Sequence, residues 1–185
     1  MIPTAPLRAR NRLAAAVLAA LGDAEARRFL ERVATDRAAL EAWLAPDERG
    51  GGEQLRQRAG VAAAAVRTLP LADPASSLPV ALAAAAALFD AGLGFEVHEV
   101  LEPHWAAAQG DGREALQGLI QVAVGFQHLA NGNLDGARAL VGEGAARLRG
   151  RRLDGLALDG FARAAAAAVA GGLANYVLVV NGRNG

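Results

Sequence analysis

Residues 113–148 read REALQGLIQVAVGFQHLANGNLDGARALVGEGAARL. Apolar residues recur at helical spacing over two stretches, Arg113 to Ala130 and Leu134 to Arg149. The turn-forming residues Asn131, Gly132 and Asn133 separate them. So short a connection favours two helices that run antiparallel to each other. The stretch therefore predicts a helical hairpin.

The helical pattern extends on both sides of this hairpin. It predicts further helices over Val80 to Ala91, Phe95 to Ala108 and Leu156 to Ala170, with glycine-rich breaks between them. Helices joined by short connections predict an all-α fold, an up-and-down helical bundle of antiparallel helices. Residues 176–185 form a β-branched tail whose conformation, extended or helical, stays open at this stage.

A different pattern precedes residue 80. Apolar stripes over residues 13–21 and 29–44 predict helices, Asp23 is a candidate N-cap, and a weaker helix is expected from Glu53 to Leu69. A linker composition follows, with Pro70, Pro74, Ser76, Ser77 and Pro79. We therefore expect an N-terminal helical extension over residues 1–79 and a helical bundle domain over residues 80–185.

Composition excludes several functional classes. The 19 basic residues, all of them arginine, balance 19 acidic ones, and this balance predicts neither a nucleic-acid nor a membrane partner. Cysteine is absent, which excludes disulfides, thiolate zinc sites and cysteine nucleophiles. A soluble cytoplasmic protein with a mature N-terminus is the simplest expectation.

Residues 88–148 carry a dense and ordered set of features that resembles one family. The sequence runs LFDAGLGFEVHEVLEPHW and continues, after a short loop, into the hairpin quoted above. The matching positions are Phe95, Glu96, His98, Glu99, Glu102, Trp105, Leu116, Gln117, Gly118, Leu119, Ile120, Gln121, His128, Gly132, Asn133, Gly136 and Ala137. This block is similar to the domain of unknown function 309, an uncharacterised family of bacterial and archaeal helical proteins. The resemblance implies a small helical bundle and brings no established activity.

The chain departs from the family pattern at two positions. Ala106 stands where the family usually has arginine, and Gln127 stands where it often has tyrosine. Contacts that those side chains make in relatives do not carry over to this chain.

Polar residues line up on two consecutive predicted helices. At 100° per residue, one broad face of the first helix carries Phe95, His98, Glu99, Glu102 and Trp105. A face of the second carries Gln117, Gln121, Val124 and His128. Carboxylates, imidazoles and carboxamides of antiparallel neighbours are therefore expected to meet.

One interpretation of these faces is a metal-binding or acid–base site. Its candidate catalytic or metal-ligating residues are His98, Glu99, Glu102 and His128, beside a polar and aromatic cluster of Gln117, Gln121, Phe95 and Trp105. The motif lacks the second histidine of H-E-x-x-H zinc sites and the E-x-x-H of di-iron bundles, and His104 lies on the opposite side of the helix from Glu99. No cofactor is required by the sequence, and a divalent metal is compatible with it.

The other interpretation is a structural or protein-interaction role. In it His98 and Glu102 form an intrahelical pair, Gln121 and His128 bridge helices, and the aromatic side chains Phe95, Trp105 and Phe126 belong to the core. The hairpin resembles one tetratricopeptide unit, but such units need stacked copies. An uncharacterised helical-bundle protein that forms homo-oligomers is the leading hypothesis, and a hydrolase-like metal or acid–base enzyme is the alternative.

Three structural expectations follow. Pro103 should bend or locally break the helix that contains it, because proline removes the hydrogen bond to the carbonyl of Glu99. Glu99, Gln121 and His128 should form one connected buried cluster. Helices rich in alanine, with few large apolar side chains, should bury a face against a second copy of the chain.

Overall fold

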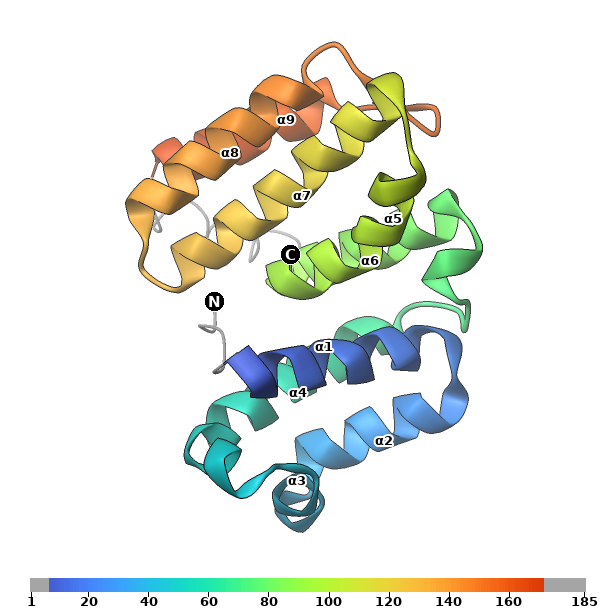
Figure 1. Cartoon of the computed structure of the whole chain (residues 1–185), viewed down its shortest axis with the longest axis vertical. Coiled ribbons are helices and arrows are strands. Elements are labelled where there is room, and N and C mark those ends of the chain that lie inside the picture. The colour runs from blue at the N-terminus through green and yellow to red at the C-terminus, as the bar shows by residue number, and fades with distance from the viewer. Residues whose placement is uncertain (1–6, 172–185) are drawn as a thin grey trace, which may run out of the picture. The chain divides into compact units, whose positions relative to one another are not determined.

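The computed structural model describes residues 7–171 and confirms the all-α helical bundle (Figure 1). Its N-terminal helices are α1 (Leu7–Gly22), α2 (Ala24–Thr35), α3 (Arg37–Trp43), the 3-10 helix η1 (Pro46–Gly51), α4 (Gly52–Arg67) and the 3-10 turn η2 (Pro74–Ser76). They are followed by α5 (Leu78–Asp90), α6 (Gly94–Ala107), α7 (Gly110–Ala130), α8 (Leu134–Leu148), the strands β1 (Arg152–Leu153) and β2 (Leu156–Ala157), and α9 (Asp159–Ala170).

The chain forms two compact units, residues 1–100 and residues 101–185. In the first, α4 packs against α2, α1 and α5. In the second, α7 and α8 lie side by side and antiparallel, and α9 packs on α8 (Figure 1). The division falls inside α6, and the boundary expected near residue 79 remains a prediction.

Aspartate caps divide the first predicted stripes into helices. The predicted N-cap Asp23 is confirmed, since its carboxylate accepts a hydrogen bond from the amide of Ala26 at 2.6 Å. The stripe over residues 29–44 is not one helix, because Asp36 takes an extended conformation and accepts bonds from the amides of Ala38 and Ala39. A side chain that satisfies the free amides of a new helix favours a new start there.

The helix expected from Leu156 begins later. Leu153 and Leu156 pair in a short antiparallel hairpin, turned by Asp154 and Gly155, whose φ angles are 48° and 78°. Two successive residues of positive φ suit a tight hairpin turn, for which Asp-Gly is a favoured pair. The α9 helix therefore starts at Asp159.

Glycine allows α7 and α8 to approach closely. A Cβ atom built on Gly144 would lie 2.7 Å from the carbonyl oxygen of Gly118, and one on Gly125 would lie 2.5 Å from Cγ2 of Val141. No side chain fits at such distances. The predicted hairpin is thus confirmed with its helices in backbone contact.

The local break expected as one of two outcomes at Pro103 does not occur, and the other outcome, a bend, stays a prediction. The α6 helix continues from Gly94 to Ala107 with Pro103 inside it. Proline removes one backbone hydrogen bond, but its fixed φ near −65° is a helical value, so the flanking turns can hold the helix together.

Two further sequence expectations concern other parts of the chain. The β-branched tail over residues 176–185 lies outside the described residues. Among the helices that the structure does describe, none has the length and apolar character needed to cross a bilayer.

Candidate metal-binding site

The α6 helix positions the candidate residues. Gly92, at φ 75°, ends the preceding helix, and the amide of Leu93 bonds to the carbonyl of Leu88 at 2.9 Å. This is a glycine-terminated helix end that turns the chain sharply. Leu93, Val97 and Leu101 then recur every four residues and are almost fully buried. Their burial fixes the rotation of α6 about its axis.

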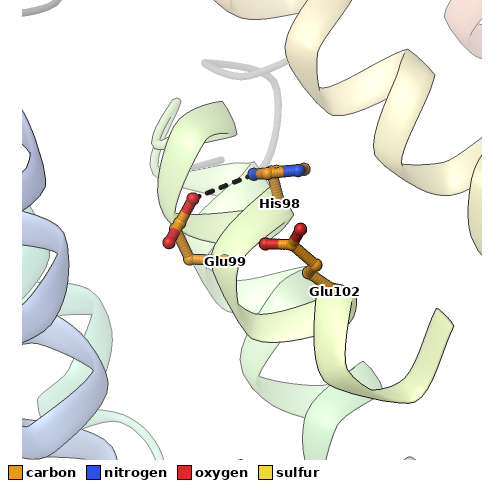
Figure 2. Close-up of side chains that lie close together, drawn as sticks. All are labelled: His98, Glu99 and Glu102. Atoms are coloured by element: carbon orange, nitrogen blue, oxygen red, sulfur yellow. Dashed lines mark hydrogen bonds and ion pairs between the residues drawn. The ribbon is translucent and has the colours of Figure 1, made fainter. Parts of the chain in front are cut away.

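That rotation leaves His98, Glu99 and Glu102 accessible. The side chains of His98 and Glu99 are 29% and 33% exposed, and Glu102 is exposed. Nδ1 of His98 lies 3.0 Å from Oε1 of Glu99, and the carboxylate of Glu102 turns toward the same side of the helix (Figure 2). One ligand atom from each residue lies within 4.8 Å of the others. In the described part of the chain, these three are the residues that form a group able to hold a metal ion.

The distances are close to those of a metal site. Two ligand atoms that each lie about 2.1 Å from one ion are at most about 4.2 Å apart. The glutamate side chains must therefore rotate to bring the three atoms, which lie within 4.8 Å of one another, around one ion. One imidazole nitrogen and two carboxylate oxygens are a ligand set for zinc, manganese or ferrous iron.

The two aromatic neighbours of these residues were expected in the core, but they are not core residues. Phe95 and Trp105 are only half-buried. The guanidinium carbon of Arg10 lies 3.9 Å from the ring centre of Phe95, and that of Arg113 lies 4.0 Å from the ring centre of Trp105. Cation–π contacts of this kind occur at the surface, where the guanidinium keeps its hydration. The third aromatic residue, Phe126, is buried as predicted.

Gln121, a candidate residue of α7, forms its hydrogen bond within the α7–α8 hairpin. Nε2 of Gln121 donates to a carboxylate oxygen of Glu143 in α8 at 3.0 Å. Oε1 of Gln121 is buried and accepts no hydrogen bond from the described residues. Gln117, on the same helix, is half-buried.

His128 is held at the turn that follows α7. Its Nδ1 lies 2.9 Å from Nδ2 of Asn133, whose Oδ1 accepts a bond from the amide of Gly136 at 2.9 Å. A Cβ atom on Gly136 would approach both side chains to within 3.0 Å. His128 therefore has a structural partner in the N-cap of α8.

Gln121 and His128, both in the second unit, do not form the hydrogen-bonded cluster that was expected, and the place of Glu99 beside them stays a prediction. All three residues are half-buried. The hydrogen bonds described above join Glu99 to His98, Gln121 to Glu143 and His128 to Asn133. The candidate residues that the structure brings together are His98, Glu99 and Glu102.

A buried ion pair in the first unit was not expected from the sequence. Nη2 of Arg58 lies 3.0 Å from Oε2 of Glu96, and their side chains are 1% and 0% exposed. Glu96 was noted only as a position of the family block. The signal in the sequence was that this carboxylate stands between two apolar residues, Phe95 and Val97. Its partner, 38 residues earlier, carries no local signature.

The comparisons with known proteins identify one domain. Residues 82–140 match the model of a domain of unknown function, DUF309, which confirms the resemblance of this region. The matched segment contains all the candidate site residues. No curated protein and no solved structure matches the chain.

Proposed function

We propose that this chain, which carries the DUF309 domain over residues 82–140, binds a divalent transition-metal ion through His98, Glu99 and Glu102. The observation that supports the proposal is the convergence of three ligand atoms, each from a different side chain, to within 4.8 Å. All three come from consecutive turns of one helix, so the set does not depend on how distant parts of the chain pack.

The composition of the set points to a class of metal. An imidazole favours zinc, manganese, iron or cobalt over calcium and magnesium, which prefer oxygen ligands alone. Three protein ligands leave at least one coordination position for water. A metal of this class lowers the pKa of bound water, which is the chemistry that a hydrolase-like or acid–base role would use.

A direct test measures metal in the protein itself. The chain is purified without an affinity tag, its metal content is determined by mass spectrometry, and the metal-free protein is titrated with Zn²⁺ and Mn²⁺ by calorimetry. We expect about one ion per chain. His98→Ala and Glu102→Gln should each weaken binding by more than about 100-fold, since the loss of an outer-shell group alone costs about 10- to 100-fold.

His104→Ala is the matched control. It removes the same type of side chain from the same helix, and His104 does not belong to the group of three. The control should bind metal like the parent. The proposal is contradicted if the parent protein binds neither ion. It is also contradicted if the His98→Ala protein keeps its helical circular dichroism and binds metal as tightly as the parent.

We also propose that the chain self-associates, the role that its composition favours. The supporting observation is that Leu7, Leu71, Leu134 and Leu156 are 64%, 50%, 43% and 56% exposed. Association with a second copy would remove such apolar area from water at about 25 cal/mol per Å². Light scattering at high micromolar concentration should give the mass of a dimer, and the mass of a monomer would refute this role.

A further inference from the structure

A pocket separate from the metal-binding residues lies in the first unit, between α3, η1 and the start of α4. Its volume is about 360 Å³. Pockets that bind small molecules begin at about 300 Å³. The size therefore suits a ligand of one or two rings.

The floor of this pocket is apolar. It is formed by Leu40 and Leu44, which are 3% and 4% exposed. A Cβ atom on Gly52 would lie 3.6 Å from Cδ1 of Leu44 and 3.8 Å from Cδ2 of Leu40. Because Gly52 has no side chain, the small exposed part that each leucine retains borders the pocket.

The rim is charged and carries a net positive charge. Arg37, Arg49 and Arg56 line it together with Glu41 and Glu53, so three positive and two negative charges leave a net charge of +1. Arg37 and Arg56 pair with the glutamates, at 2.7 Å and 2.8 Å. Arg49 forms no ion pair with the described residues, so its charge is the one not balanced within the rim.

The pairs hold two of the arginines in place. Arg56 donates from Nε and Nη2 to both oxygens of Glu53, and from Nη1 to the carbonyl of Ala34. Arg37 donates to Glu41 from Nε. The two terminal nitrogens of Arg37 form no hydrogen bond with the described residues and remain available as donors, beside Arg49.

The pairs also stabilise the charged forms of rim residues. The hydrogen bond with Glu41 raises the pKa of Arg37, and the hydrogen bond from Arg56 lowers the pKa of Glu53 below its usual value. Both shifts favour the charged forms of these two side chains.

We propose that this pocket binds a small organic carboxylate, with the carboxylate on Arg49 and Arg37 and the apolar part on Leu40 and Leu44. A guanidinium fork matches the two oxygens of a carboxylate, and charge-assisted bonds of this kind are among the strongest. A net charge of +1 matches one negative charge and not the two of a phosphate ester. The apolar floor excludes ligands that are polar throughout.

The test uses 2-naphthoate as probe, titrated into the full chain by calorimetry at constant ionic strength with chloride as the balancing anion. We expect saturable binding of 2-naphthoate, and much weaker binding of uncharged 2-naphthylmethanol. Arg49→Gln should weaken 2-naphthoate binding by about tenfold or more, the effect of one lost charged hydrogen bond.

Arg28→Gln is the control, because it removes one exposed arginine from the same unit away from the pocket. It should bind 2-naphthoate like the parent. The proposal is overturned if the parent does not bind 2-naphthoate, if folded Arg49→Gln protein binds it unchanged, or if Arg28→Gln loses as much affinity. Tighter binding of 2-naphthyl phosphate than of 2-naphthoate would overturn the assignment to carboxylates.

Discussion

Arg58 and Glu96 form an ion pair that is shielded from solvent on all sides. Nη2 of Arg58 lies 3.3 Å and 3.0 Å from the two carboxylate oxygens of Glu96. The pair joins α4 to α6 within the first unit. Glu96 belongs to the segment that matches DUF309 and Arg58 precedes it, so the preceding helices are bonded to the matched domain.

Loss of one partner of this pair should be costly. Arg58→Met leaves the carboxylate of Glu96 buried without its counter-charge, which costs about 3–5 kcal/mol of unfolding free energy. Chemical denaturation followed by circular dichroism measures the change. The double variant Arg58→Met/Glu96→Leu should regain most of the loss, because no charge remains to be buried.

The exposed pair of Arg37 and Glu41 supplies the control for this experiment. Arg37→Met should change the denaturation midpoint little, since water solvates the remaining carboxylate. A loss equal to that of Arg58→Met would show that burial is not what makes the Arg58–Glu96 pair important.

Two glycines of α8 should respond in opposite directions to alanine. Gly144→Ala places a Cβ atom 2.7 Å from the backbone of α7, and the helices must separate at a cost of about 1–3 kcal/mol. Gly142, on the same helix, has open space around its Cβ position. Gly142→Ala should stabilise the protein by up to about 1 kcal/mol, because alanine favours the helix. Thermal unfolding distinguishes the two, and equal shifts in one direction would contradict close packing of α7 and α8.

The N-cap of α8 should contribute measurably to stability. Asn133→Ala removes the acceptor of the Gly136 amide and the partner of His128, so a loss of about 1 kcal/mol or somewhat more is expected. Asn133→Ser keeps a capping oxygen and should regain part of this loss in thermal denaturation. A stability unchanged by Asn133→Ala would show that the cap is not needed to start the helix.

Acid should remove the stabilisation that Glu53 supplies. Its pKa is lowered in the folded protein, first by the hydrogen bond from Arg56, from a usual value of 4.5. The contribution is therefore complete above pH 4.5 and is lost as the pH falls through the lower folded-state value. Urea midpoints of the parent and of Glu53→Gln should differ slightly at neutral pH and converge in acid. A difference that grows in acid would contradict the direction of the shift.

The helices and the grouping of His98, Glu99 and Glu102 could be predicted because they depend on local spacing. Apolar periodicity and glycine breaks placed every long helix of the second unit to within a few residues of its bounds, apart from the start of α9. His98, Glu99 and Glu102 come together because one to four residues separate them on one helix, and backbone hydrogen bonding alone sets that geometry.

Contacts between helices were decided by the tertiary structure. Phe95 and Trp105 were expected in the core, but which side of α6 is buried depends on Leu93, Val97 and Leu101 and on the surfaces that they meet. Likewise, the sequence alone does not indicate that Gln121 finds Glu143, because the register of two packed helices depends on where their glycines allow the backbones to touch.

The Arg58–Glu96 pair shows the same limit at longer range. The sequence determined that a carboxylate stands among apolar residues of α6, and it determined an arginine on α4. Only the packing of α4 against its neighbours brings the two within 3.0 Å and excludes water from both. A buried charge is stable only when its partner is present. The fold of the chain between residues 58 and 96 brings Arg58 to Glu96.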